Sequence, residues 1–112
     1  MTSYNKINGV WSHYNYELVT TVLRDEWGFD GAALTDWWMQ RSSSPEFKQL
    51  KNDAYRIRAQ VDVLMPGGDG FVFGAKVGRK LLDTYGQPDG ITLGEMQRSA
   101  LNVLKFILRV SK

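Results

Sequence analysis

Cysteine is absent from these 112 residues, and His13 is the only histidine. The sequence therefore excludes disulfides, thiolate metal sites, iron–sulfur clusters, cysteine nucleophiles and histidine-rich metal sites. No apolar run approaches the roughly 18 residues of a membrane span, and residues 1–5 lack the basic-then-apolar pattern of a signal peptide. The formal net charge is only +2, and the longest basic cluster is Arg79-Lys80. We expect no cofactor, no metal, no nucleic-acid partner and no membrane contact.

Turn and capping residues divide the chain into alternating short apolar runs and helices. Asn15 is a good N-cap, Gly28 suits the position after a helix, and Thr92 through Glu95 has the pattern of a capping box. The apolar run 32–35 shows no alternation, which is typical of a strand covered on both faces. Strands that alternate with helices indicate an α/β fold with a parallel sheet. The spacing predicts strands at 1–4, 32–35 and 61–65, and helices at 16–27, 46–59, 75–85 and 93–110.

The chain is short for a closed version of this fold. A (β/α)8 barrel takes roughly 250 residues, and three strands cannot close a barrel because every strand edge must be paired. We expect residues 1–112 to form a single unit, either a small open sheet or a partial barrel of about three βα units. Open edges and uncovered helix faces recruit partners, so we expect a homo-oligomer that uses residues 1–4 or helix 93–110.

Polar side chains follow the predicted strands, where parallel α/β proteins carry their functional groups. The middle strand is the most informative, because Asp36 comes directly after it and is followed by Trp37 and Trp38. Aromatic faces stack on the apolar C–H faces of sugar rings, and a carboxylate can bind or attack a sugar. The alternative is that the two tryptophans only cap the sheet.

Three motifs give the chain a resemblance to a known family. They are Met1-Thr2-Ser3-Tyr4-Asn5-Lys6-Ile7-Asn8-Gly9, Leu23-Arg24-Asp25-Glu26-Trp27-Gly28-Phe29-Asp30-Gly31 and Thr35-Asp36-Trp37. In this combination they closely resemble glycoside hydrolase family 3, the family of β-glucosidases, β-xylosidases and N-acetyl-β-glucosaminidases. The stretch Val61-Asp62-Val63-Leu64-Met65-Pro66-Gly67-Gly68 and the last predicted helix resemble the end of that family's N-terminal barrel domain.

The resemblance implies roles for five residues. Asp36 matches the catalytic nucleophile, in a motif where Ser is more frequent than Thr35. Tyr4 matches a tyrosine whose hydroxyl points at the nucleophile. Trp37 matches an aromatic residue at the leaving-group side of the pocket, and Met1 and Trp38 are candidates to line the same pocket. A carboxylate nucleophile would form a covalent glycosyl-enzyme, so the implied activity is retaining hydrolysis of terminal β-linked sugars.

The resemblance also implies that this chain is a fragment that lacks most of the catalytic machinery. The family's Lys-His pair, sugar-binding Asp and Arg precede the stretch that matches, and the acid/base Glu follows the barrel in a second domain. Glu46 and Glu95 lie at helix starts, where capping explains them, and Asp69 fits a turn. We expect His13 to be structural and the isolated chain to be inactive. The alternatives are a carbohydrate-binding or interaction module that uses Trp37, Trp38 and Tyr4, and a truncated product without a function of its own.

Overall fold

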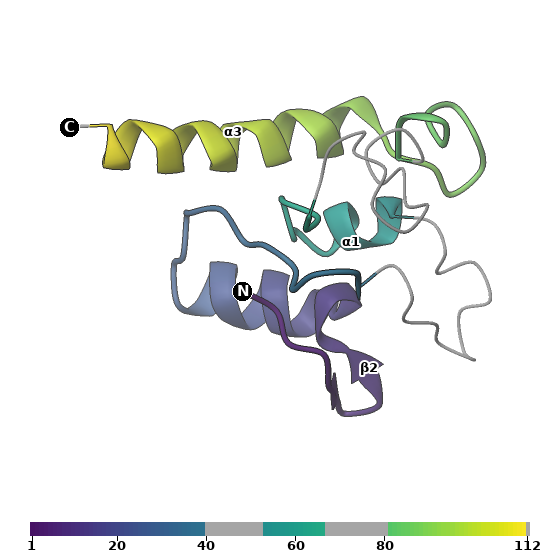
Figure 1. Cartoon of the computed structure of the whole chain (residues 1–112), viewed down its shortest axis with the longest axis horizontal. Helices are drawn as coiled ribbons and strands as arrows, with labels where there is room; N and C mark the ends of the chain where they lie inside the picture. Colours follow the sequence, from purple (N-terminus) through teal and green to yellow (C-terminus); the bar gives the residue numbers. More distant parts are fainter. Residues whose placement is uncertain (40–52, 67–80, 112) are drawn as a thin grey trace.

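The computed structural model describes residues 1–39, 53–66 and 81–111. Figure 1 shows helix α3 (Leu93–Val110) along one side of the molecule and the helix η2 (Glu17–Glu26) on the opposite side. The short helix α1 (Ala54–Arg58) and the extended chain that follows η2 lie between them. The described residues therefore form a small α/β piece, as the alternation of apolar runs and helices predicts.

Helix η2 begins and ends where the sequence places its caps. The side chain of Asn15 accepts a hydrogen bond of 3.0 Å from the Leu18 N–H, and Gly28 follows the helix with φ +68°. The helix is a ten-residue π-helix and not an α-helix, because the Trp27 N–H bonds the Val22 carbonyl five residues earlier. Apolar spacing over so few turns gives the buried face of a helix but does not distinguish these two hydrogen-bond patterns.

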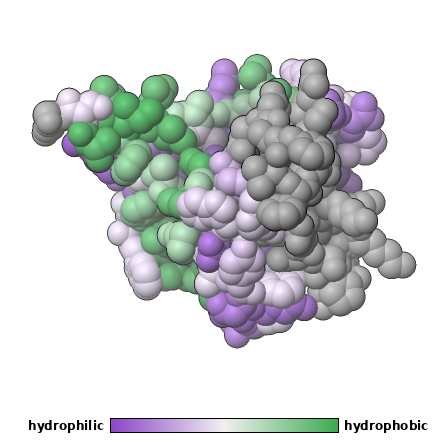
Figure 2. All heavy atoms as spheres, in the orientation of Figure 1, coloured by the Kyte–Doolittle hydropathy of each residue, from purple (hydrophilic) through white to green (hydrophobic). Residues whose placement is uncertain are grey.

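Helix α3 has the predicted bounds and the predicted start. The Thr92 hydroxyl accepts from the Glu95 N–H, and the Glu95 carboxylate accepts from the Thr92 N–H, which completes the capping box. On the side that packs on the molecule, Met96 contacts the hydrophobic core, but the two buried residues, Ser99 and Asn102, are polar. Leucines occupy exposed positions instead, and Figure 2 shows apolar residues gathered over the C-terminal half of the helix.

The described part of the predicted helix 46–59 is α1, which confirms its C-terminal end. The first residues of that prediction, and most of the predicted helix 75–85, lie outside the described residues. Arg98 of α3 donates a hydrogen bond of 2.8 Å to the Ile57 carbonyl and so satisfies an acceptor at the end of α1.

Three extended segments lie side by side in the predicted order. Leu34 and Val63 form a parallel β-bridge, in which the Val63 N–H bonds the Ala33 carbonyl and the Thr35 N–H bonds the Val63 carbonyl. On the other side, the Thr2 N–H donates a hydrogen bond of 2.8 Å to the Leu34 carbonyl. Segment 33–35 is therefore the middle one, and its carboxyl end lies next to that of segment 61–65.

The sheet that the described residues do form is an antiparallel hairpin that the sequence reading overlooked. Strand β1 (Lys6–Ile7) pairs with β2 (Val10–Trp11), with Lys6 opposite Trp11. Asn8 and Gly9 join the strands at φ +52° and +82°, the conformation that an Asn-Gly hairpin turn requires. The three predicted parallel strands are reduced, in the described part of the chain, to the single Leu34–Val63 bridge. A strand ladder needs several successive backbone hydrogen bonds to neighbouring strands, and segments of three to five residues can form only a few.

Apolar residues from segment 61–65 serve two small cores. Val61 packs with Val19 and Ala33 on the side of η2, and Leu64 packs in a second cluster with Ala54, Ile57 and Ile91. A short strand with both faces covered explains why this run shows no polar alternation. The two cores hold the segment in place, and with it the adjacent end of segment 33–35.

Candidate functional site

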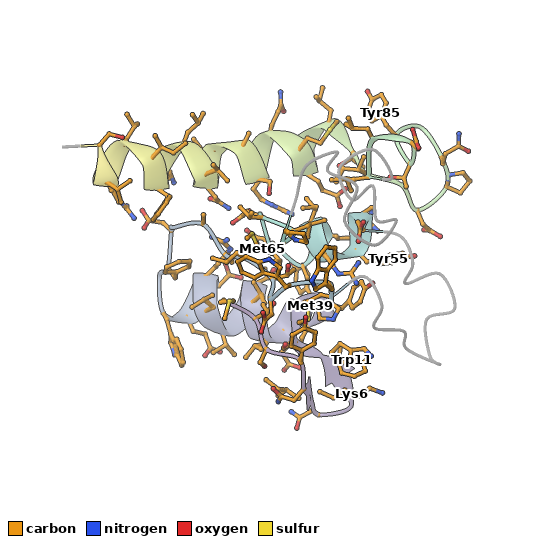
Figure 3. The ribbon with its side chains drawn as sticks, in the orientation of Figure 1. Lys6, Trp11, Met39, Tyr55, Met65 and Tyr85 are labelled. Atoms are coloured by element: carbon orange, nitrogen blue, oxygen red, sulfur yellow. The ribbon has the colours of Figure 1, made fainter. Side chains whose placement is uncertain are left out.

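The candidate site lies at the carboxyl ends of the two bridged segments. The buried Thr35 hydroxyl accepts a hydrogen bond of 2.8 Å from the Met65 N–H, and the Trp38 N–H donates one of 3.2 Å to the Met65 carbonyl. Residues 35–38 are thus tied at both ends to Met65. Figure 3 shows Met39 and Met65 near each other in the middle of the molecule.

Asp36 is half-buried and opens the turn that follows segment 33–35. Its Oδ1 accepts a hydrogen bond of 2.7 Å from the Trp37 N–H, which holds the carboxylate at the beginning of the turn. The Trp37 side chain is 45% exposed, whereas Trp38 is half-buried. Trp38 adopts φ +63°, an unfavourable value for a bulky side chain, so its conformation depends on the contacts that hold the turn.

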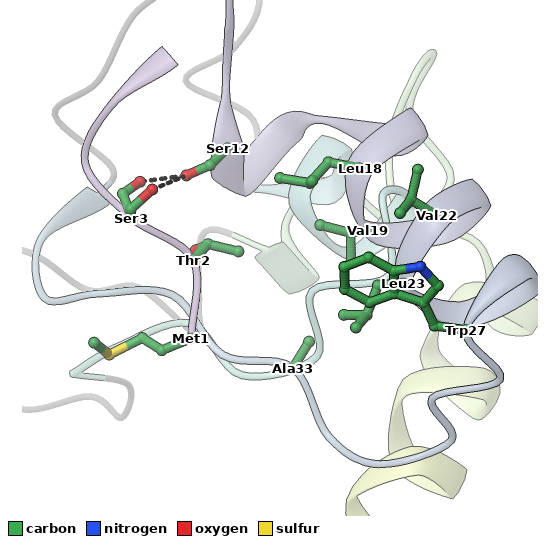
Figure 4. A pocket seen from close by; sticks show the side chains of 10 residues that line it. All are labelled: Met1, Thr2, Ser3, Ser12, Leu18, Val19, Val22, Leu23, Trp27 and Ala33. Atoms are coloured by element: carbon green, nitrogen blue, oxygen red, sulfur yellow. Dashed lines mark hydrogen bonds between the residues drawn. The ribbon is translucent and has the colours of Figure 1, made fainter. Parts of the chain in front are cut away.

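Tyr4 and Met1 are placed near the first extended segment. Tyr4 is 49% exposed in the bend after that segment, and Met1 is 75% exposed. Met1 lines a mostly apolar cavity of about 170 Å³ between residues 1–3 and η2, where Ser3 and Ser12 are hydrogen-bonded (Figure 4). Asp36, Tyr4 and Trp37 are not among the residues that line this cavity. The roles of Met1 and Tyr4 at Asp36 stay predictions.

A buried polar cluster contacts the turn of residues 36–39, which is the Asp36 turn. The Arg56 guanidinium, which is fully buried, donates to the Asp53 carboxylate, to the Met39 carbonyl at 2.7 Å and to His13 Nδ1 at 3.0 Å. Its carbon also lies 4.2 Å from the centre of the Tyr14 ring, within the range of a cation–π contact. The cluster connects the turn at Met39 with α1 and with the short 3-10 helix η1 (Ser12–Tyr14).

Burial and charge set the ionisation of this cluster. Burial, together with the Arg56 charge, lowers the pKa of His13 from 6.5 to about 3, so the imidazole is neutral at ordinary pH. Burial also raises the pKa of the Tyr14 hydroxyl. Burial lowers the pKa of Arg56, although Tyr14 and Asp53 oppose the shift. His13 is therefore held without charge inside the protein, where its Nδ1 accepts the hydrogen bond from Arg56.

Glu95, the other carboxylate considered, is occupied structurally. Besides the capping box, it accepts a 2.6 Å ion-pair hydrogen bond from Arg58. Burial opposes ionisation of Glu95, but the hydrogen bonds from Arg58 and Thr92 outweigh it and lower the pKa of the carboxyl. Glu95 is therefore unsuited to donate a proton to a leaving group. Glu46 and Asp69 lie outside the described residues.

The buried ion pairs were not predicted from the sequence. Arg56 pairs with Asp53, and Arg24 pairs with Asp62, although charged residues at helical spacing usually face solvent. No local pattern marks these four residues as interior, since their burial depends on segments far away in the chain. For the described residues, no group of three or more His, Asp or Glu could hold a metal ion, and no helix is long and apolar enough to cross a membrane.

Comparison with known proteins connects these features with a family of enzymes. The sequence model described as "Glycosyl hydrolase family 3 N terminal domain" matches residues 1–82. A β-glucosidase of Ruminococcus albus is 39% identical over 108 residues, which cover 96% of this chain and 11% of the relative. An exo-α-(1→6)-L-arabinopyranosidase of Bifidobacterium longum is 65% identical over 37 residues, which cover 33% of this chain and 5% of the relative.

Comparison with solved structures also finds β-glucosidases that are similar in fold. A β-glucosidase from Paenibacillus barengoltzii superposes with a TM-score of 0.68 at 37% identity, over 96% of this chain and 12% of that one. β-Glucosidase 3B from Thermotoga neapolitana superposes with a TM-score of 0.72 at 24% identity, over 94% of this chain and 14% of that one, and supports the fold alone. The chain spans about a tenth of the length of the first relative. With 82 of its 112 residues matched, the chain belongs to glycosyl hydrolase family 3.

Proposed function

We propose that this chain supplies the nucleophile side of the active site of a retaining β-glycosidase. The observation that carries the proposal is the position of Asp36, which stands half-buried at the end of segment 33–35 beside the exposed Trp37. Functional side chains of parallel α/β folds project from that end of the sheet. The relatives named β-glucosidases support a glycoside as the substrate class.

In the proposed reaction the ionised Asp36 carboxylate attacks the anomeric carbon of a terminal β-linked sugar. A bond forms between a carboxylate oxygen and that carbon, while the glycosidic bond breaks and its oxygen leaves with a proton from an acid. Water then attacks the same carbon and gives its proton to the conjugate base of that acid, while the bond between the carbon and the Asp36 carboxylate breaks. The sugar is released with its configuration retained after the two inversions. The acid must stand across the glycosidic bond, about 5–5.5 Å from the nucleophile in retaining enzymes.

Other residues have supporting roles in the proposal. Trp37 offers an aromatic face to the sugar on the leaving-group side, and Trp38 and Met1 contribute further apolar surface. The Tyr4 hydroxyl would donate a hydrogen bond to Asp36 and favour its ionised form. Because the Glu95 carboxylate is held by Arg58 and by the Thr92 N–H, we infer that Glu95 is not the acid and that another carboxyl group of the enzyme supplies the proton. The isolated chain should then be inactive.

The same reasoning extends to the fold. We infer that segments 1–4, 32–35 and 61–65 are three successive strands of a (β/α)8 barrel, with the intervening helices on the outside. The Leu34–Val63 bridge and the Thr2–Leu34 hydrogen bond support this order. The bridge also supports a parallel direction for segments 32–35 and 61–65. A partial barrel of this kind would place Tyr4, Asp36 and Met65 at one rim.

Covalent labelling tests the function directly. A 2-deoxy-2-fluoro-β-glucoside with a good leaving group slows release of the sugar, so the glycosyl-enzyme accumulates. The protein that carries this chain in its natural context should gain one fluorosugar, and fragmentation of its tryptic peptides should place the adduct on Asp36. An adduct on Asp25, Glu26 or Asp30, which share a tryptic peptide with Asp36, would refute the assignment. Sugar-dependent changes in tryptophan fluorescence without any adduct would favour the non-catalytic binding module.

A further inference from the structure

The contacts of Arg56 point to a further role in the proposed reaction. We propose that Arg56 is a positioning residue that fixes the Asp36 turn through the Met39 carbonyl, and that His13 orients Arg56 for this task. The inference rests on the proposed role of Asp36 as the nucleophile. It assigns no contact between Arg56 and the sugar, so its effect on Asp36 is indirect.

Each nitrogen of the Arg56 guanidinium has a separate partner. Nε donates to His13 Nδ1 at 3.0 Å, Nη1 to the Asp53 carboxylate and Nη2 to the Met39 carbonyl at 2.7 Å. The Tyr14 ring lies 4.2 Å from the guanidinium carbon. A planar fork that is fixed at three nitrogens has little freedom left, so the Met39 carbonyl meets a donor of defined position.

The Asp36 turn is anchored at two neighbouring residues, Trp38 and Met39. Trp38 is held at φ +63° by its N–H bond to the Met65 carbonyl, and the next residue is held by Arg56. These two bonds act on neighbouring residues and from two different segments of the chain. Loss of the Arg56 bond would remove the anchor on the residue that follows the strained Trp38, so the turn would relax and move the Asp36 carboxylate.

His13 supplies an acceptor that packing alone does not need. Arginine only donates, so His13 Nδ1 must be unprotonated where it meets Arg56 Nε, and in neutral imidazole the proton is then on Nε2. Nε2 is buried and has no hydrogen-bond partner in the described structure. A phenylalanine would fill the same space without an unpaired N–H. What histidine adds at this position is the hydrogen bond to Arg56.

The acceptor also persists over a wide pH range. Burial and the Arg56 charge hold the pKa of His13 at about 3, so Nδ1 stays available at neutral and mildly acidic pH. The groups around the imidazole are Arg56, the Tyr14 ring and the Trp11 ring, whose centroid lies 6.3 Å from that of the imidazole. Asp53 pairs with the Arg56 charge. The orientation of Arg56 is thus independent of ordinary changes in pH.

Two substitutions of His13 separate the hydrogen bond from the volume. His13→Asn keeps an acceptor at the position of Nδ1, and His13→Phe keeps the ring but has no acceptor. Thr20→Val is the matched control, because it removes a buried hydrogen bond of 3.2 Å to the Ala59 carbonyl without touching the turn. Arg56→Lys keeps the charge for Asp53 but cannot reach three partners, and should behave as His13→Phe does.

Hydrogen exchange of the 112-residue chain measures the position of the turn. We expect the Trp38 amide to exchange about tenfold faster in His13→Phe and in Arg56→Lys, the size expected for loss of one buried hydrogen bond. In His13→Asn and in Thr20→Val the Trp38 amide should keep its protection, and the Thr35 amide should keep it in all variants. Unchanged protection of Trp38 in both His13→Phe and Arg56→Lys would overturn the proposal.

The rate of fluorosugar labelling then connects the turn with the chemistry. In the protein that carries this chain, His13→Phe should slow labelling of Asp36 by about tenfold or more at saturating sugar, as misplacement of a reacting group does. The concentration for half-maximal rate should stay near the wild-type value, and His13→Asn should restore the labelling rate. A labelling rate in His13→Phe equal to that of Thr20→Val would show that the cluster only stabilises the fold.

The two proposals can fail separately. If the wild-type protein gains no adduct on Asp36, the proposed function fails before any variant is compared. Slower labelling of Asp36 in His13→Phe with an unchanged Trp38 amide would place the effect outside the turn and refute the route through Met39. Faster exchange of Trp38 with unchanged labelling would separate the turn from Asp36 and equally refute the proposal.

Discussion

Arg24 Nη2 lies 2.6 Å from Asp62 Oδ2, and this ion pair is almost completely buried. The same Asp62 oxygen accepts from the Ala33 N–H, and the other oxygen accepts from Ser99 and Asn102 of α3. One carboxylate thus joins η2, the middle extended segment and α3. This contact explains why Ser99 and Asn102 on the inner side of α3 are polar, since their hydroxyl and amide groups complete the shell of a buried charge.

Asp62→Ala should be among the most destabilising single changes in the chain. It leaves the Arg24 charge buried without its partner, and loss of one member of a buried pair costs about 3–5 kcal/mol. Urea denaturation of the chain measures the loss. Asp30→Asn is the control, because the Arg109–Asp30 pair has a similar distance of 2.6 Å but is exposed. The control should lower the free energy of unfolding far less. Equal losses would contradict the central role of Asp62.

Thr35 should depend on its hydroxyl more than on its methyl group. Thr35→Val removes the acceptor of the Met65 N–H and leaves that buried donor unpaired, at a cost of about 1–3 kcal/mol. Thr35→Ser keeps the acceptor. Amide hydrogen exchange at Met65 should therefore be accelerated in the valine variant and close to wild type in the serine variant. Fast exchange in both variants would show that the methyl group holds the two segments together.

Local signals predicted much of the fold. The capping box and apolar spacing predicted the bounds of α3, and Asn15 and Gly28 predicted those of η2. The Asn8-Gly9 pair is also a local signal for a hairpin turn, although the hairpin was not predicted from it. The π-helical type of η2 had none that a count of apolar positions could show.

The candidate site was predictable only in part, for a physical reason. Asp36 follows an apolar run, so its place at the end of an extended segment could be predicted from its neighbours in sequence. The contacts beneath it could not, because Arg56 meets His13 from a position 43 residues away. Burial of such a group is decided by tertiary packing, and one sequence carries no periodic signal for it.

Acid should weaken the fold partly through His13. The folded-state pKa of about 3 lies below the ordinary value of 6.5, so the unfolded chain takes up the proton first as the pH falls. The contribution of neutral His13 is fully present above pH 6.5 and is lost progressively towards pH 3. Between these two pH values, this contribution to the free energy of unfolding falls by about 1.4 kcal/mol per pH unit. Urea denaturation at several pH values should show a shallower decline for His13→Asn. Parallel declines would place the acid sensitivity elsewhere.

Asp36→Asn should separate chemistry from folding. The amide keeps the shape of the side chain and can still accept the Trp37 N–H bond, but it cannot serve as the nucleophile. In the protein that carries this chain, we expect turnover of an aryl β-glucoside to fall to background, with the thermal midpoint nearly unchanged. Tyr4→Phe removes one proposed donor and should lower the rate less. Activity of Asp36→Asn near the wild-type level would leave Asp36 with only the role of a turn residue.

The outer face of α3 should mediate self-association of the chain. Leu101, Leu104 and Leu108 are exposed at a spacing of three and four residues, with Ile107 beside them, whereas the inner face carries Ser99 and Asn102. Such a stripe is self-complementary, because a second copy related by a two-fold axis presents the same leucines. We therefore expect a dimer at micromolar concentration.

Substitution at the middle of this stripe tests the association. Leu104→Gln puts a polar group at the centre of the interface in both copies, and burial of one leucine is worth about 1.5–3 kcal/mol. Light scattering should show dimers for the wild-type chain and monomers for Leu104→Gln at the same concentration. Leu82→Gln is the matched control, since Leu82 is 60% exposed and lies outside α3, and it should leave the dimer intact. A wild-type chain that stays monomeric at micromolar concentration would refute self-association, and a dimer that survives Leu104→Gln would place the interface on another surface, with the edge of residues 1–4 next in line.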